Sequence, residues 1–372
     1  MWVVRKSFCI FFCMILGLSV SLVAGELKKN NYWESNKEIK DAIAKRKGKT
    51  ELSKLALKMK PGTWAKLDTI APAKLWRVGS VGRKPHLDIH GWTDDGAWDS
   101  RTGQFIFMGF RLALKCIAYS EETNEWRTIP ERFKWPRKNA FGHIYSNNAH
   151  DFIRGVYYHH IAGSKLVYGY DLKSKKWEGL PPIPMKKGKM ASSLEYFPEL
   201  GGLVRHGHDK KLYLYNDKKK NWSTLGQTQV CGYHSMARYN SQRKELLLAG
   251  GGGSPNTIEV VDSKGNIKRL DDCPSELNIR GDKLTYDPVS GRYLIIVIKD
   301  KKFYELDSEK NEYRLISEWT DNMPISSYAV CAPIPEYGVI MFAATERRKG
   351  VMLYKHKISE NKPLDTQISS KK

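Results

Sequence analysis

The chain has 372 residues and a formal net charge of +22, with 62 lysines and arginines against 40 aspartates and glutamates. A positive surplus of this size favours polyanionic partners. None of the six cysteines belongs to a Cys-x-x-Cys pair, so the spacing indicates no zinc site. We also expect no other metal and no cofactor.

The first 25 residues have the pattern of a signal peptide. Arg5 and Lys6 precede an apolar stretch, Ser7–Val23, and small residues near Gly25 offer a cleavage site. We therefore expect an exported protein, secreted or periplasmic. The apolar stretch is also long enough for an uncleaved membrane anchor, which is the one way in which we expect the protein to contact a membrane.

Residues 26–61 are rich in Lys and Glu, and their apolar residues recur at roughly helical spacing. Ile39 and Ile43 belong to one such stretch, and Leu52 and Leu55 belong to another. The spacing predicts two short helices that break near Gly48. They would form either a solvated spacer or a strap on the outside of the domain that follows.

A four-residue motif then recurs: an aromatic or aliphatic residue, two others, and Leu or Ile. Copies begin at residues 126, 177, 222, 267 and 313, each after an apolar stretch that usually ends in Tyr-x or Tyr-Asp. A period of about 45–50 residues built from short strands is typical of a β-propeller, with one four-stranded blade in each repeat. We expect the repeated Trp and Tyr rings to pack between blades. In the second repeat the expected strands are Gly142–Asn147, Arg154–Ile161, Lys165–Asp171 and Trp177–Leu180.

Two predicted strands that lack a partner in their own repeat indicate how the ring closes. Trp64–Leu67 is an outer strand with no blade before it, and Val351–Tyr354 is a third strand with no outer strand after it. Pairing them completes a sixth blade and removes the open sheet edges. The sequence thus predicts an all-β, six-bladed propeller over residues 62–357, closed by an N-terminal outer strand. A seventh blade between Leu67 and Trp98 is the main alternative.

The repeats resemble those of the kelch-type, or galactose-oxidase-like, propellers. Tyr170 is followed seven residues later by Trp177, as Tyr215 is by Trp222, and Gly250–Gly253 is similar to the diglycine that follows the second strand in this family. The resemblance covers most of residues 62–357 and implies a kelch-like propeller. Copper oxidation of the galactose-oxidase type would need two Tyr and two His ligands and a Tyr–Cys cross-link. We match no set of residues to that pattern.

Cys231 and Cys273 lie in equivalent loops before two neighbouring blades. Because export permits disulfides, the sequence is compatible both with a bridge between them and with two separate buried thiols. Residues 358–372 are expected to form a disordered tail.

Propeller ligands usually bind at one mouth of the central channel, where loops enter the first strands. Here those loops carry arginines, which can clamp a carboxylate, and aromatic rings, which can stack on a sugar. His143 and His234 each lie near the start of an expected first strand and are the candidates for a general base, with a structural histidine as the competing interpretation. The candidate ligand contacts are His90, Trp92, Arg137, His143, Tyr233, His234 and Arg280.

The repeats are clear and a catalytic set is not, so we expect an exported binding module rather than an enzyme. Its expected ligand at the mouth is a carbohydrate, an acidic polysaccharide included, or a protein. We expect a monomer and no nucleic-acid partner, because no nucleic-acid-binding motif is present. A carbohydrate-active enzyme, an epimerase or a lyase using His, Arg and Tyr at the mouth, is the alternative. A structural protein of the cell envelope is a third class.

Overall fold

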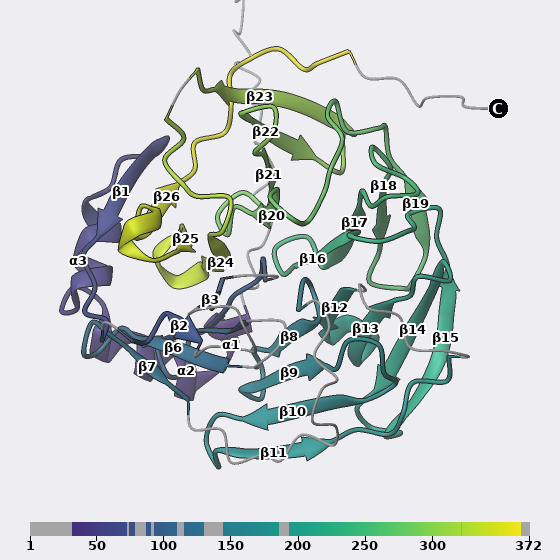
Figure 1. The fold of residues 1–372 in the computed structure, drawn as a ribbon, viewed down its shortest axis with the longest axis horizontal. Coiled ribbons are helices and arrows are strands. Elements are labelled where there is room, and N and C mark those ends of the chain that lie inside the picture. Colours follow the sequence, from purple (N-terminus) through teal and green to yellow (C-terminus); the bar gives the residue numbers. More distant parts are fainter. Residues whose placement is uncertain are drawn as a thin grey trace, which may run out of the picture. The chain divides into compact units, whose positions relative to one another are not determined.

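The computed structural model describes residues 32–72, 74–78, 87–90, 93–109, 115–129, 144–185, 193–320 and 322–365. Six four-stranded antiparallel sheets form a ring, which makes the fold a six-bladed β-propeller (Figure 1). The first strand of each blade lies toward the middle and the fourth at the periphery. The predicted architecture is confirmed, and the described residues contain no seventh blade.

The first three blades follow one another in chain order. Blade 1 contains β4 (Ala97–Asp99), β5 (Gln104–Gly109), β6 (Lys115–Ser120) and β7 (Glu125–Thr128). Blade 2 contains β8 (Asn148–Asp151), β9 (Val156–His160), β10 (Val167–Asp171) and β11 (Lys176–Gly179). Blade 3 contains β12 (Ser193–Phe197), β13 (Gly202–His206), β14 (Lys211–Asn216) and β15 (Asn221–Gln227).

The remaining blades complete the ring. Blade 4 contains β16 (Met236–Asn240), β17 (Glu245–Ala249), β18 (Ile258–Val261) and β19 (Ile267–Arg269). Blade 5 contains β20 (Lys283–Tyr286), β21 (Tyr293–Val297), β22 (Lys302–Asp307) and β23 (Glu312–Glu318). Blade 6 contains β24 (Val330–Ile334), β25 (Val339–Ala343), β26 (Val351–Lys355) and β1 (Thr63–Leu67). Two short strands, β2 (Arg77–Val78) and β3 (Leu87–Asp88), pair with each other before blade 1.

The N-terminal strand closes the ring as predicted. β1 pairs antiparallel with β26, placing Trp64 opposite Tyr354, and their ring centroids are 4.5 Å apart. On the inner side, Gly96 N donates to Cys331 O at 3.1 Å and so joins blade 1 to blade 6. The outer edge of β26 is thus paired rather than open, which stabilises the closed ring.

The repeated aromatic pairs lie between blades, as expected. Tyr170 and Trp177 have centroids 5.0 Å apart and pack against apolar side chains of blade 1. Tyr215 and Trp222 repeat the arrangement at 5.3 Å against blade 2, where Trp222 Nε1 donates to Pro181 O at 2.8 Å. Each pair fills the space between two sheets that diverge toward the outside.

Three helices precede the ring: α1 (Tyr32–Ser35), α2 (Lys37–Arg46) and α3 (Glu51–Lys58). We call residues 32–58 the strap. The predicted break occurs at Gly48, whose φ of +75° suits glycine, and Thr50 and Ser53 form a capping box that starts α3. The short helix α1 was not predicted. In the described part of the chain, no helix combines the length and the apolar character that a membrane span requires.

The strap packs on the seam between blades 6 and 1. Arg46 Nε lies 2.8 Å from Glu121 Oε2, and the same guanidinium donates to the Ser100 and Arg101 carbonyls. It also lies 3.9 Å from Glu336, which belongs to the turn that follows β24. The strap therefore holds the end of the propeller at which the first strands finish.

Two expectations about local structure were wrong. The first strand of blade 2 begins at Asn148 rather than at residue 142, because Ser146 has a φ of +44° and Asn147 N closes a turn onto Ile144 O. The start of the expected disordered tail is docked on blade 5, where Leu364 N donates to Tyr313 O at 2.8 Å. The segment predicted as a signal peptide and residues 366–372 lie outside the described residues.

Candidate functional site

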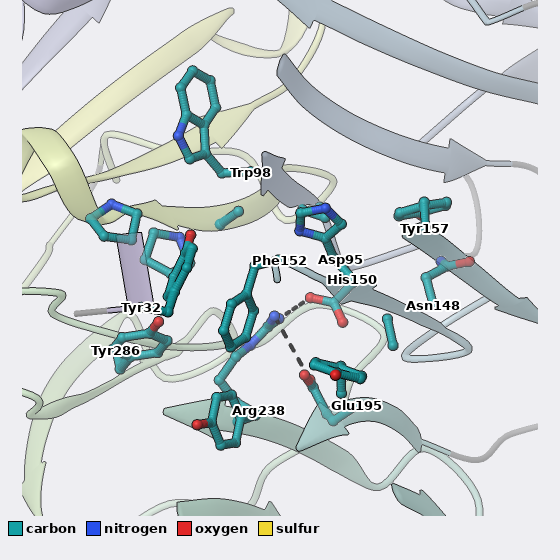
Figure 2. A pocket seen from close by; sticks show the side chains of 18 residues that line it. Tyr32, Asp95, Trp98, Asn148, His150, Phe152, Tyr157, Glu195, Arg238 and Tyr286 are labelled. Carbon is teal, nitrogen blue, oxygen red and sulfur yellow. Dashed lines mark hydrogen bonds and ion pairs between the residues drawn. The ribbon is translucent and has the colours of Figure 1, made fainter. Parts of the chain in front are cut away.

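The centre of the channel holds a buried cluster of charged side chains. Arg238 of β16 pairs with Asp95, which precedes β4, and its Nη1 lies 3.8 Å from Glu195 Oε1 of β12 (Figure 2). Lys283 of β20 is buried nearby and donates to Ser327 O at 3.0 Å. Charges from four blades meet here, because alternate residues of each first strand face the channel.

Burial weakens the charged form of these groups. It raises the pKa of Glu195 well above the ordinary value of a glutamate, and the negative charge of Asp94 adds to the rise. It also raises the pKa of Asp94 and lowers that of Lys283. Pairing with Arg238 offsets part of the desolvation cost, so the cluster is stable only while its members remain together.

We call the end of the channel next to the strap the strap mouth. Phe152 covers it, with centroid distances of 4.1 Å to Tyr32, 5.8 Å to Tyr196 and 5.9 Å to Tyr239 (Figure 2). Tyr32 comes from the strap and shares a 3.2 Å hydrogen bond with Ser100 Oγ. The cavity beneath has a volume of about 80 Å³. That volume is well below the ~300–1,000 Å³ of typical ligand pockets.

The channel also holds a buried histidine beside a carboxylate. His150 Nε2 lies 3.6 Å from Asp99 Oδ1, and burial lowers the pKa of His150 in spite of that carboxylate. The imidazole is therefore neutral in the folded protein. Within the ranges that the structure describes, no three His, Cys, Asp or Glu side chains are grouped so that they could hold a metal ion.

We call the opposite end, where loops enter the first strands, the loop mouth. Tyr233 and His234 precede β16, and their ring centroids are 3.9 Å apart. His234 also meets the edge of Tyr145 at 5.6 Å, and Ile279 N donates to its carbonyl at 3.4 Å. The φ of His234 is +70°, a left-handed conformation that favours glycine. The packing of two neighbouring loops thus holds this imidazole in place.

Charged groups surround these rings. Burial raises the pKa of Tyr145 to about 12; the charge of Asp94 raises it further and that of Arg280 opposes the rise, so both charges lie near the phenol. Arg280 is exposed. Arg348 lies over the ring of Tyr328, with Cζ 3.5 Å from the centroid, and Tyr328 is 42% exposed. The loop mouth therefore presents aromatic faces and guanidinium groups to solvent.

The structure brings together three of the candidate residues, Tyr233, His234 and Arg280, at this mouth. His90 is elsewhere: it is 1% exposed and stacks between Trp76 and Phe107, with centroids 5.1 and 5.2 Å away. Enclosed by these rings, His90 packs in the core rather than facing a ligand. The other candidates, Trp92, Arg137 and His143, lie outside the described residues.

Cys231 and Cys273 are not joined by a disulfide in this structure. Cys273 packs in the apolar core between blades 4 and 5, and its amide donates to Asn256 O at 2.8 Å. Cys231 lies beside the glycine loop, with its amide bonded to Ser254 Oγ at 2.8 Å. These separate anchors hold the two residues in different surroundings.

Several residues of both mouths were not predicted from the sequence. Tyr145 and Tyr328 contribute rings to the loop mouth, and Arg238 and Glu195 occupy the channel. A charged residue inside an apolar first strand, as in Met236–Asn240, is the signal that could have identified Arg238.

Comparisons with known proteins add no family. No protein-family model matches the chain, and no curated protein sequence matches it. Among solved structures, a structural genomics protein of unknown function from Bacteroides thetaiotaomicron VPI-5482 is 13% identical, over 68% of this chain and 67% of its own, with a TM-score of 0.49. A structure of the nidogen/laminin complex is 11% identical, over 59% of this chain and 77% of its own, with a TM-score of 0.45. The propeller assignment rests on the sheet topology, and membership of the kelch-type family stays a prediction.

Proposed function

We propose that this protein is an exported binding module that takes a carbohydrate carrying a carboxylate at the loop mouth. The observation that supports this function is the exposed Arg280, which follows Ile279 in the loop bonded to the His234 carbonyl and whose charge acts on the Tyr145 phenol. A guanidinium can bind a carboxylate through two parallel hydrogen bonds, and an aromatic face can stack on a sugar ring. A protein ligand bound at the same mouth is the other form of this proposal.

Calorimetric titration with galacturonic acid and with galactose tests the role of Arg280. Arg280→Ala should weaken binding of the acid about tenfold or more, because a charge-assisted hydrogen bond is lost, and should leave the weaker binding of the neutral sugar unchanged. Tyr233→Ala should weaken both. Lys299→Ala, which removes another exposed cation from a turn at the same end of the propeller, is the control. An equal loss of affinity for the acid in Arg280→Ala and Lys299→Ala would show a general effect of charge and no specific role for Arg280.

The backbone of His234 favours a second candidate, a carbohydrate-active enzyme. Strained conformations of non-glycine residues collect at functional sites, and the His234 imidazole belongs to the same mouth. Incubation with oligogalacturonides tests this, with product followed by mass spectrometry. A lyase product that disappears in His234→Ala supports the enzyme, and an unchanged substrate supports the binding module.

A further inference from the structure

We propose that the outer turns of blades 2, 3 and 4 form a docking surface for an acidic polysaccharide. These turns join β10 to β11, β14 to β15, and β18 to β19. The surface uses none of the loop-mouth residues, so it does not depend on the function proposed above. We call it the lysine rim, and its members are Lys173, Lys175, Lys176, Lys218, Lys219, Lys220, Lys264 and Lys268, all exposed.

The three turns lie on the same side of the propeller, the one that carries the strap. In blades 2 and 3 this turn folds beside the turn that joins the first and second strands of the same blade. Leu172 N donates to Gly155 O at 3.0 Å in blade 2, and Asp217 N to Gly201 O at 2.9 Å in blade 3. Figure 1 shows β11, β15 and β19 following one another along the periphery. The lysines of three consecutive blades therefore form one arc.

Acids offset only part of the charge of this arc: Asp171 and Asp262 act on Lys173 and Lys264 through space, without forming ion pairs with them. Each turn begins with an aspartate, but Asp171 accepts from Ser174 N, Asp217 from Arg154 Nη2, and Asp262 from Lys264 N. Within the described part of the chain, no lysine of the rim forms an ion pair. Eight ammonium groups thus remain in solvent, where they repel one another until an anion approaches.

The equivalent turns of other blades differ. Blade 1 carries Glu121 and Glu122 in this turn, and blade 5 carries Glu309 beside Lys310. Lysines whose only role is to keep sheet edges soluble would be useful on every blade. Their concentration on three neighbouring blades favours a partner that extends along the rim.

The chemistry of the rim points to a polysaccharide. Exposed charges are screened over about 8 Å at physiological salt, so the partner must bring closely spaced anions along its own chain. Bases of single-stranded nucleic acid would need exposed aromatic rings to stack on. The large exposed apolar residues of the described chain are Leu57, Ile70, Ile153, Val289, Tyr328 and Ile358, and none belongs to the rim.

The test compares two variants of the full chain with equal net charge. The rim variant changes Lys173, Lys176, Lys218, Lys219, Lys264 and Lys268 to Gln, and leaves Lys175 and Lys220 because their φ values are +58° and +53°. The control variant changes six exposed lysines elsewhere to Gln: Lys40, Lys47, Lys58, Lys60, Lys74 and Lys299. Binding to immobilised polygalacturonate is measured at several salt concentrations, with double-stranded DNA as competitor.

The rim variant should lose at least tenfold in affinity at low salt and show a weaker dependence on salt, whereas the control should change less than threefold. Equal losses of affinity in the two variants would show that binding depends on net charge and not on the position of the lysines, which would overturn the proposal. Competition by DNA at the same charge concentration would also overturn it, because the rim would then not select a polysaccharide. Both variants are measured again with Arg280→Ala added, which removes the carboxylate contact at the loop mouth. The tenfold difference between the rim and control variants should persist there, and its disappearance would assign polymer binding to the loop mouth instead of the rim.

Discussion

The strap mouth and the loop mouth both gather arginine and tyrosine side chains, but in different surroundings. Arg238 is 8% exposed and paired with Asp95 above a cavity of about 80 Å³. Arg280 is exposed, and Tyr328, in the loop before β24, is 42% exposed. Separating a buried guanidinium from its carboxylates leaves unpaired charges in the protein interior, where they are poorly solvated. An exposed guanidinium can exchange water for a ligand at little cost in free energy. We therefore expect the first mouth to contribute to stability, whereas the second has the exposure that the proposed binding requires.

Matched removal of the two arginines gives the largest expected effect. Arg238→Met should lower the free energy of unfolding by about 3–5 kcal/mol, because Asp95 and Glu195 would remain buried without their partner. Arg280→Met should change it by less than about 0.5 kcal/mol, because the side chain is exposed. Urea unfolding measures both. Adding Asp95→Asn and Glu195→Gln to Arg238→Met should restore much of the loss, and similar values for the two single variants would break the comparison.

The pH dependence of stability should distinguish the two ends next. Burial raises the pKa of Glu336, which supports the strap, to about 7, against the opposing hydrogen bonds from Trp98 and Ser100. Between about pH 4.5 and 7 the folded protein therefore holds a proton that the unfolded chain releases, so Glu336 makes the free energy of unfolding fall as pH rises. Its contribution is fully present below pH 4.5 and lost above pH 7.

Glu336→Gln should remove this fall, which we expect to be on the order of 2 kcal/mol across the window. Unfolding by urea at pH 4.5, 6 and 7.5 measures it, and Arg280→Gln at the loop mouth should keep the wild-type profile. A Glu336→Gln profile parallel to that of the wild type would show that other buried groups carry the pH dependence.

The smallest effect concerns the backbone of His234. With φ at +70°, a Cβ is disfavoured, so His234→Gly should be more stable than His234→Ala by about 1 kcal/mol. This reverses the usual order of the two residues, because glycine ordinarily costs more conformational entropy on folding. Thermal unfolding of the pair isolates the strain, since both variants lack the imidazole. If alanine is the more stable, the loop relaxes, and the argument from strain to function at this mouth fails.

The number of blades and the closure of the ring were predictable because both follow from motifs that repeat in the sequence. The outer strand at Trp64 and the third strand at Tyr354 each lacked a partner strand, and only pairing with each other could complete a blade. The start of β8 was not predictable from the pattern, because the left-handed conformation of Ser146 ends an apolar run that otherwise resembles a strand.

The charged cluster in the channel could not be predicted from the sequence for a different reason. Arg238 and Asp95 are 143 residues apart, and neither belongs to a local motif; only the closed ring makes them neighbours. His90 shows the converse. Its position in a loop before the first strand suggested a ligand contact, but Trp76 and Phe107 enclose it, and packing of this kind cannot be inferred from spacing.

The seam between β1 and β26 has a consequence for how the protein is made. Leu67 cannot meet Val351 until nearly the whole propeller has been synthesised, which takes on the order of 15–60 s at ordinary translation rates. Throughout that interval the nascent chain carries an early strand without a mate. Chaperone capture, or threading through an export channel before folding, would protect the unfinished protein from association with its own copies.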